Sequence, residues 1–162
     1  FCTITLILVH PQLWYFFDFG TFLIFGFFFI TVNFTLLETS FRGSYWDLFL
    51  LTSFFLGSII TLAMLVGSFF RSTLMAFQVM GFSSYPIFMI TGYSVPSQAL
   101  PTVVNFLANL MPTAPYLKAY ISVVQMGGAL ADNSHHLVHI LILWVIYTLL
   151  LLWRFSFLKR NA

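Results

Sequence analysis

Charged residues are what this sequence has least of. Its 162 residues include six Lys or Arg and four Asp or Glu, which is 6% of the chain, against about 25% in an ordinary soluble domain. So few charges cannot keep a surface of this size hydrated, which excludes a soluble globular domain. Hydrophobic residues make up 60% and the mean hydropathy is +1.00, which excludes a disordered chain. We therefore expect the chain to be solvated by the lipid bilayer.

The sequence also lacks the residue patterns of catalysis. Its single cysteine, Cys2, has no second thiol for a disulfide or a metal site. Phosphate-binding loops, zinc-protease motifs and serine-hydrolase motifs do not occur. His135, His136 and His139 have no Glu or Cys nearby to complete a metal shell. We expect no enzyme activity and no metal or cofactor bound by this chain, and the only close basic pair, Lys159 and Arg160, argues against nucleic acid as a partner.

Long apolar runs predict a polytopic, all-α transmembrane helix bundle that forms a single domain. About four spanning helices are expected at residues 13–37, 48–70, 73–95 and 137–158. The apolar pieces of residues 102–126 are interrupted by prolines and are too short to cross, so they predict two short re-entrant helices. The run from Phe1 to Val9 is also too short to span, and we expect the chain to be a fragment of a longer protein.

Basic residues beside the spans predict the orientation. Four of them fall on one side and two, Arg42 and Lys118, on the other. The four are Arg71, Arg154, Lys159 and Arg160. Since basic residues are retained on the cytoplasmic side, the C-terminus is expected to be cytoplasmic.

Small residues recur at intervals of four in the second expected span. Gly57 and Thr61 form one such pair, and Ala63 and Gly67 form another. This spacing allows helix backbones to approach closely. We expect it to serve helix packing within the bundle, with a dimerisation or gating surface as the alternative.

Several short segments, in their order along the chain, resemble a known family. The segments are FRGS at Phe41–Ser44, GSFFRSTLMAFQ at Gly67–Gln78, PIFMITGYSVPSQALPTVVNFLANLMPTAPYLKAY at Pro86–Tyr120, and GGAL at Gly127–Leu130. Together they resemble the membrane (permease) subunit of type-2 ATP-binding-cassette (ABC) exporters, within the bacterial multidrug-like group. The resemblance covers residues 13–162, as the C-terminal half of such a permease.

The resemblance implies an efflux transporter of the bacterial inner membrane that works by alternating access. Its partners would be an ABC ATPase subunit that binds ATP, a second permease subunit in a homo- or heterodimer, and a periplasmic membrane-fusion protein. The substrate would be hydrophobic or amphipathic: a drug, a lipid or a glycan. Within this picture we expect an extracellular gate at Gly92, Pro96, Pro101, Pro112 and Pro115. Residues expected to line the translocation path are Phe27, Asn33, Phe77 and Tyr85.

Two other classes remain open from the residues themselves. A secondary transporter needs buried ionisable groups, and Asp18 is the one acidic candidate within a span. The alternative role of Asp18 is a carboxylate at a helix N-terminus near the interface. A structural or assembly membrane protein without transport activity would need only helix packing.

Overall fold

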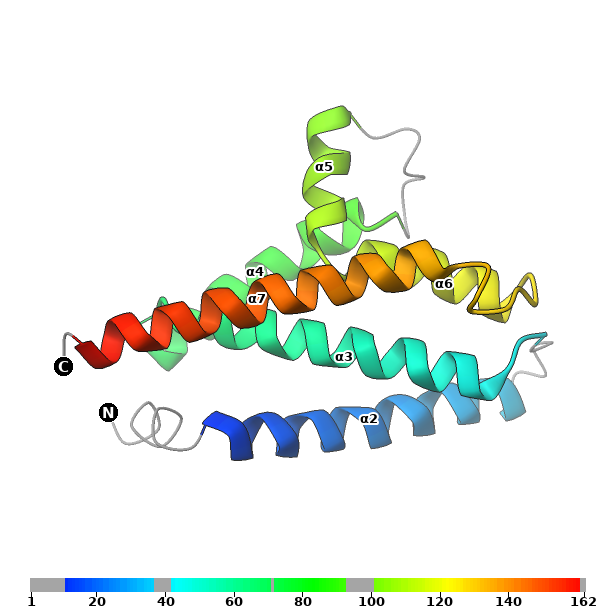
Figure 1. The fold of residues 1–162 in the computed structure, drawn as a ribbon, viewed down its shortest axis with the longest axis horizontal. Helices are drawn as coiled ribbons and strands as arrows, with labels where there is room; N and C mark the ends of the chain where they lie inside the picture. Colours follow the sequence, from blue (N-terminus) through cyan, green and yellow to red (C-terminus); the bar gives the residue numbers. More distant parts are fainter. Residues whose placement is uncertain (1–10, 37–41, 71, 93–100, 161–162) are drawn as a thin grey trace.

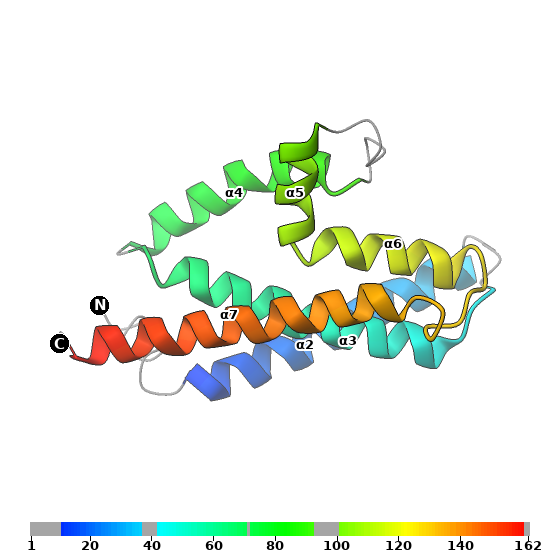
Figure 2. The same cartoon turned by 45° about the horizontal axis from the view of Figure 1, so that its top comes forward.

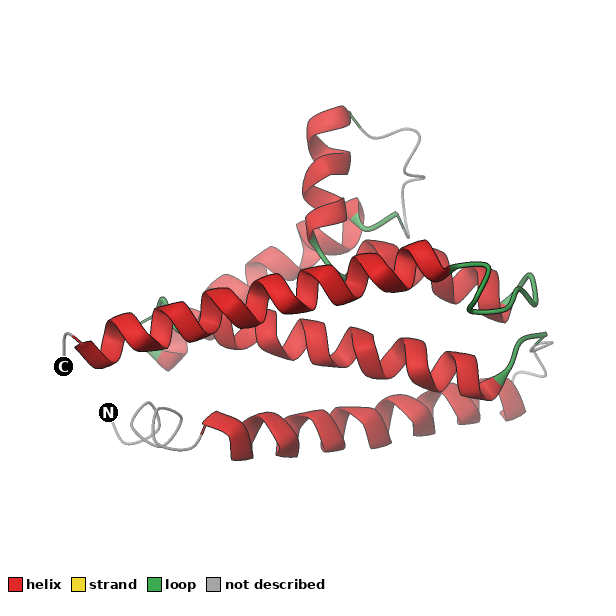
Figure 3. Ribbon diagram, in the orientation of Figure 1, coloured by secondary structure: helices red, strands yellow, loops and turns green. Residues whose placement is uncertain are grey.

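The computed structural model describes residues 11–36, 42–70, 72–92 and 101–160. This part of the chain is built from helices and contains no strand (Figures 1 and 3). The helices are α2 (Pro11–Leu36), α3 (Tyr45–Gly67), α4 (Thr73–Ile90), α5 (Thr102–Leu110), α6 (Thr113–Val124) and α7 (Ser134–Arg160). The expected all-α helix bundle is thus confirmed.

Three of the described helices are long and apolar enough to cross a membrane. The qualifying stretches are Tyr15–Val32 of α2, Tyr45–Gly67 of α3 and Ser134–Phe157 of α7. Helix α3 has 23 residues, about 34 Å at 1.5 Å per residue, which exceeds the roughly 30 Å of hydrocarbon in a bilayer. By length and composition, the chain is therefore a membrane protein.

Helix α4 stands in place of the span expected at 73–95, and it is shorter. It has 18 residues and ends at Ile90. Its apolar part, Leu74–Ile90, is shorter than the stretches that qualify α2, α3 and α7 as candidate spans. Residues 93–95 lie outside the described part. Pro86 is inside the helix, where it supplies no backbone N–H to the carbonyl one turn earlier. Figure 2 shows α4 diverging from α3.

The two short helices expected within residues 102–126 are α5 and α6. They have nine and 12 residues, too few to cross a bilayer. Prolines define their starts: Pro101 and Pro112 are the N-cap residues, and Pro115 is the third residue of α6. The first backbone N–H groups of a helix have no partner within it, so proline costs no hydrogen bond at these positions.

Helix α3 is the centre of the bundle and packs against α2, α6 and α7. Around it, Leu51, Ala119 and Ile140 form one buried cluster. A second buried cluster consists of Leu65, Leu143, Tyr147 and Leu151. The guanidinium of Arg154 lies 4.9 Å from the Phe69 ring centroid.

The bundle has two ends. The start of α2, the turn after α3 and the end of α7 lie together at what we call the turn end (Figure 1). The segment before α3 and the segment between α6 and α7 lie at the opposite, loop end (Figure 1). This arrangement places Arg154 at the turn end and Arg42 at the loop end, on opposite sides as the charge pattern predicts.

Candidate functional site

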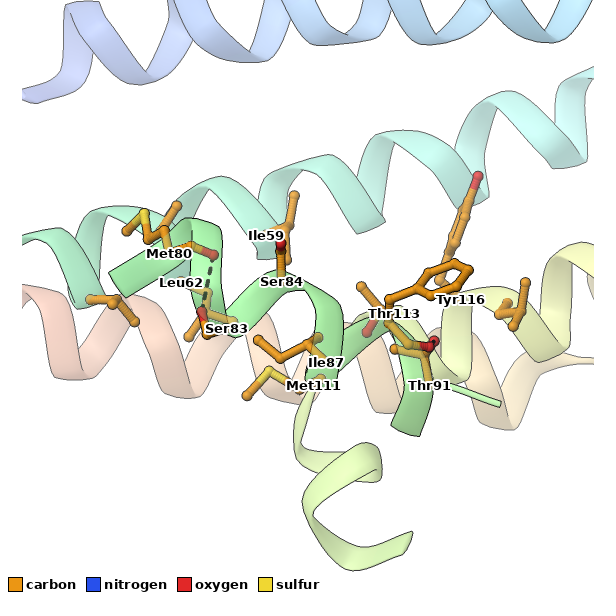
Figure 4. Close-up of a pocket in the computed structure, with 14 residues that line it drawn as sticks. Ile59, Leu62, Met80, Ser83, Ser84, Ile87, Thr91, Met111, Thr113 and Tyr116 are labelled. Atoms are coloured by element: carbon orange, nitrogen blue, oxygen red, sulfur yellow. Dashed lines mark hydrogen bonds between the residues drawn. The ribbon is translucent and has the colours of Figure 1, made fainter. Parts of the chain in front are cut away.

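An open groove of about 540 Å³ lies between α3, α4 and α6. Its wall is almost entirely apolar, and residues from α3 face residues from α4 across it (Figure 4). Helix α3 contributes Ile59, Leu62, Ala63 and Val66, and helix α4 contributes Met80, Ser83, Ser84, Ile87 and Phe88. Thr91, Met111, Thr113, Tyr116 and Leu117 close the groove at the α6 side. A space of this size and character suits a hydrophobic or amphipathic small molecule.

Four serine and threonine residues interrupt the apolar wall, in addition to Tyr116. Ser83 donates to the Met80 carbonyl at 3.1 Å and Ser84 donates to that of Gly81 at 2.7 Å. Thr91 donates to the Phe88 carbonyl at 2.8 Å. These three hydroxyls use their donors within their own helix. The Thr113 Oγ1 atom is buried without a hydrogen-bond partner, so it offers no polar group at the groove surface either.

Tyr116 fixes the α6 wall of the groove against α3. Its ring stacks on Phe55 with centroids 4.1 Å apart, and its hydroxyl lies 3.4 Å from Thr52 Oγ1. Burial raises the pKa of the Tyr116 hydroxyl, and the hydrogen bond with Thr52 opposes this effect. The neutral phenol therefore serves as a structural hydrogen-bonding group rather than as an acid or base.

A polar contact joins the three long helices, α2, α3 and α7. Tyr15 of α2 donates to the Gly57 carbonyl at 3.2 Å, and Thr61 donates to the same carbonyl at 2.7 Å. Trp144 Nε1 of α7 donates to Thr61 Oγ1 at 3.2 Å. A Cβ atom on Gly57 would lie 2.9 Å from the Trp144 ring. Glycine is thus required at position 57 for α7 to lie this close to α3.

The other small residues of α3 have different surroundings. Ala63 lines the groove. Gly67 ends α3, and an added Cβ there would find nothing within 4 Å. The Gly57 and Thr61 pair therefore lies at a contact between helices. The Ala63 and Gly67 pair lies on an open surface of α3.

A second polar contact, which we call the clasp, closes the loop end. The backbone N–H of Arg42 donates to the Val124 carbonyl at 3.3 Å, and Asp47 Oδ2 accepts from the Leu130 N–H at 3.1 Å. A Cβ atom on Gly43 would clash with the Val123 carbonyl. The segments FRGS and GGAL, far apart in the sequence, are thus neighbours here, except that Phe41 lies outside the described residues.

Of the expected path-lining residues, the three whose side chains are described, Phe27, Phe77 and Tyr85, do not belong to the groove lining. Phe27 packs edge-on against Phe49 of α3, with ring centroids 6.1 Å apart. Phe77 and Tyr85 are 71% and 69% exposed, and neither belongs to the groove lining. Asn33 lies on α2, but its side chain is outside the described part. In the single chain, Phe77 and Tyr85 therefore face the surroundings rather than the cavity.

The expected gate residues surround the far end of α4 and the short helices. Gly92 follows α4 with a φ of 94°, in the left-handed region that favours glycine. Pro101 is exposed, whereas Pro112 and Pro115 are fully buried at the start of α6. Pro96 lies outside the described residues. Gly92 thus follows α4, and the three described prolines lie at the starts of α5 and α6, the helix that forms one wall of the groove.

The ionisable candidates do not converge on a site. Asp18 is partly exposed on α2. The rings of His135 and His136 lie 3.9 Å apart. Within the described ranges, no group of three or more His, Cys, Asp or Glu side chains is placed to hold a metal ion.

Sequence reasoning missed the α4 side of the groove. A usable signal was present: Ser84 and Thr91 are seven residues apart, with Ile87 between them, and all three line the groove. Residues three, four and seven apart share one face of a helix. The hydroxyls in this otherwise apolar helix therefore marked its groove side, whereas the aromatic Phe77 and Tyr85 lie elsewhere.

Comparison with known proteins finds no matching family model, no matching curated protein and no matching solved structure.

Proposed function

We propose that this chain is the permease part of an ATP-driven exporter that moves a hydrophobic or amphipathic substrate across the membrane. The observation that carries the proposal is the open apolar groove between α3, α4 and α6. The hydrophobic part of a drug, a lipid or a glycan conjugate would find almost entirely apolar walls there. The order of the FRGS, proline-rich and GGAL segments supports the same class.

The packing of α4 supports a transporter over a static scaffold. Helix α4 makes its main contacts with α5, whereas α3 is held by α2, α6 and α7. A transporter needs surfaces with two packed arrangements, one for each side of the membrane. Helix α5 is tied to the bundle, since Tyr147 of α7 donates to the Leu110 carbonyl, so α4 is the helix that can approach or leave α3 without disturbing the polar contact among Tyr15, Thr61 and Trp144.

The proposal includes an orientation and partners. The turn end, with Arg154, would face the cytoplasm of a bacterium, and the chain would lie in the inner membrane. ATP would be hydrolysed on a separate ABC ATPase subunit, since this sequence has no phosphate-binding loop. A second permease subunit and a periplasmic membrane-fusion protein complete the proposed assembly.

The test is purification of the full-length subunit from detergent-solubilised membranes with its natural neighbours. We expect an ABC ATPase to co-purify, and its hydrolysis rate to rise in the presence of an exported hydrophobic compound. Dependence of hydrolysis on this subunit distinguishes a functional complex from adventitious association. A subunit that purifies alone, and whose deletion leaves efflux unchanged, would favour a structural or assembly protein built on the α2, α3 and α7 contact.

A further inference from the structure

Four basic side chains gather near the loop end of the bundle, away from the groove. His135, His136 and His139 come from the start of α7, and Lys118 comes from α6, which packs against α7. The His135 and His136 rings are 3.9 Å apart. The charges of His135, Lys118 and His139 all act on His136. We call these four residues the basic cluster.

Within the described part of the chain, no acidic side chain pairs with the basic cluster. The nearest acids along the chain are Asp132, which is exposed, and Asp47, whose carboxylate accepts from the Leu130 N–H in the clasp. Among the described residues, neither acid forms an ion pair with Lys118 or the histidines. Lys118 is the positive charge of the cluster at neutral pH, and a charge with no described counter-charge favours an anionic ligand from outside the chain.

The donors of the basic cluster are side chains, not the helix terminus. The backbone N–H groups of His136 and Leu137 already donate to the Asn133 carbonyl, at 3.0 and 3.4 Å. The Lys118 ammonium carries three donors, and a neutral imidazole still carries one N–H. Since no metal-holding group of three ligands occurs within the described ranges, an anion is the ligand that these donors suit.

The basic cluster lies near the level expected for lipid headgroups. At the loop end, Tyr45 and Trp46 are exposed at the start of α3, and Asp47 beside them bonds to Leu130, just before α7. Exposed Tyr and Trp at the end of a spanning helix mark the interface between hydrocarbon and water. The first turns of α7 therefore begin close to the phosphate layer.

We propose that the basic cluster binds a phosphate group, carried by an anionic lipid or by a soluble phosphate. Lys118 supplies the standing positive charge, and His135 and His136 donate hydrogen bonds to the phosphate oxygens from the adjoining helix. Charge-assisted hydrogen bonds of this kind are stronger than neutral ones. A bound phosphate would hold α6 against the start of α7.

The experiment uses the full chain in detergent and native mass spectrometry with phosphatidylglycerol and phosphatidylcholine as probes. We expect preferential retention of phosphatidylglycerol, and about a tenfold loss of that preference in the double variant Lys118→Gln/His136→Gln, since each tenfold corresponds to about 1.4 kcal/mol. Lys118→Arg keeps the charge and should keep the preference. Arg42→Gln removes an exposed charge at the same end, outside the cluster, and serves as the matched control.

A second arm separates the two sources of phosphate. Inorganic phosphate that displaces phosphatidylglycerol from the wild type, but has no effect on the double variant, indicates a site for soluble phosphates. Retention of the lipid against inorganic phosphate indicates a lipid site. Equal lipid binding by the wild type and the folded double variant, with no phosphate effect on either, would overturn the proposal. Size-exclusion profile and far-UV circular dichroism establish that the variant is folded.

Discussion

Gly57 determines how closely α7 approaches α3. Its carbonyl accepts hydrogen bonds from Tyr15 and Thr61, and its missing side chain leaves room for the Trp144 ring. Aromatic rings rarely reach a helix backbone in this way unless the opposing residue is small. One residue thus brings together donors from α2 and α3 and the indole of α7.

Gly57→Val tests this packing. We expect the variant to lose about 1–3 kcal/mol of stability, because the new side chain must displace the Trp144 ring. Gly67→Val is the control, since nothing lies within 4 Å of a Cβ there. The measurement is the thermal midpoint in detergent. Equal midpoints for the two variants would show that α7 can move without cost.

Gly92 is the second residue whose conformation matters. Its φ of 94° is strained for any β-branched residue. We expect Gly92→Val to impair export while membrane insertion continues, because the strain falls after α4 rather than in the core. Gly81→Val, in the open middle of α4, is the control. Efflux and membrane abundance are measured together, and normal efflux by the Gly92 variant would remove its role in the gate.

At the scale of elements, the clasp ties the start of α3 to the segment between α6 and α7. Asp47 in the first turn of α3 also suits the positive end of that helix. We expect Asp47→Ala to raise the amide hydrogen exchange of Leu130 by about tenfold, since a charge-assisted hydrogen bond of about 1.5–3 kcal/mol is lost. Asp132→Ala, on the same loop, should leave this exchange unchanged. Unaltered exchange of Leu130 in the Asp47 variant would show that the clasp does not hold the loop.

The sequence predicted the elements better than their relative placement. Long apolar runs located α2, α3 and α7 closely: the expected span 13–37 corresponds to Pro11–Leu36, and the expected span 48–70 corresponds to Tyr45–Gly67. Prolines located the starts of α5 and α6. These signals are local, because hydration and backbone hydrogen bonding act within a few residues.

The groove was not predictable in the same way. Its lining depends on the rotation of α4 about its own axis, and one residue of rotation is about 100°. Apart from the Ser83 and Ser84 hydroxyls, the faces of α4 that meet α3 and that meet lipid are similarly apolar, so the sequence shows only weakly which face meets α3. Phe77 and Tyr85 were expected to line the path, whereas the α4 residues that line the groove include Met80, Ser84 and Ile87. The clasp likewise joins residues 83 positions apart.

At the scale of the whole molecule, large apolar side chains cover the outside. Phe82 on α4 is 84% exposed and Trp153 on α7 is 67% exposed. In water such a surface would aggregate, but in a bilayer it is the ordinary lipid-facing surface. The molecule therefore has a central unit, in which α3 packs against α2, α6 and α7 and α5 is hydrogen-bonded to α7, and a second, peripheral unit, α4.

Filling the groove tests whether the space between these units is used. Ala63 is an exposed residue of α3 on the groove wall. We expect Ala63→Trp to reduce export severalfold and to leave stability within about 0.5 kcal/mol, because a surface position accepts a larger side chain. Leu50→Trp, on the same helix outside the groove lining, is the control. Transport assays in vesicles, with equal protein content, measure the effect, and undiminished export would place the path elsewhere.

The long sequence separations within the bundle have a consequence for biosynthesis. Tyr15 and Gly57 are 42 residues apart, but Trp144 follows Thr61 by 83 residues, as Leu130 follows Asp47. At 5–20 residues per second, α3 therefore waits about 4 to 17 s for its last partners to be translated. During that interval the open side of Gly57 and the carboxylate of Asp47 are both uncovered. The nascent chain is thus most vulnerable to proteases and to wrong helix pairing between the synthesis of α3 and that of α7.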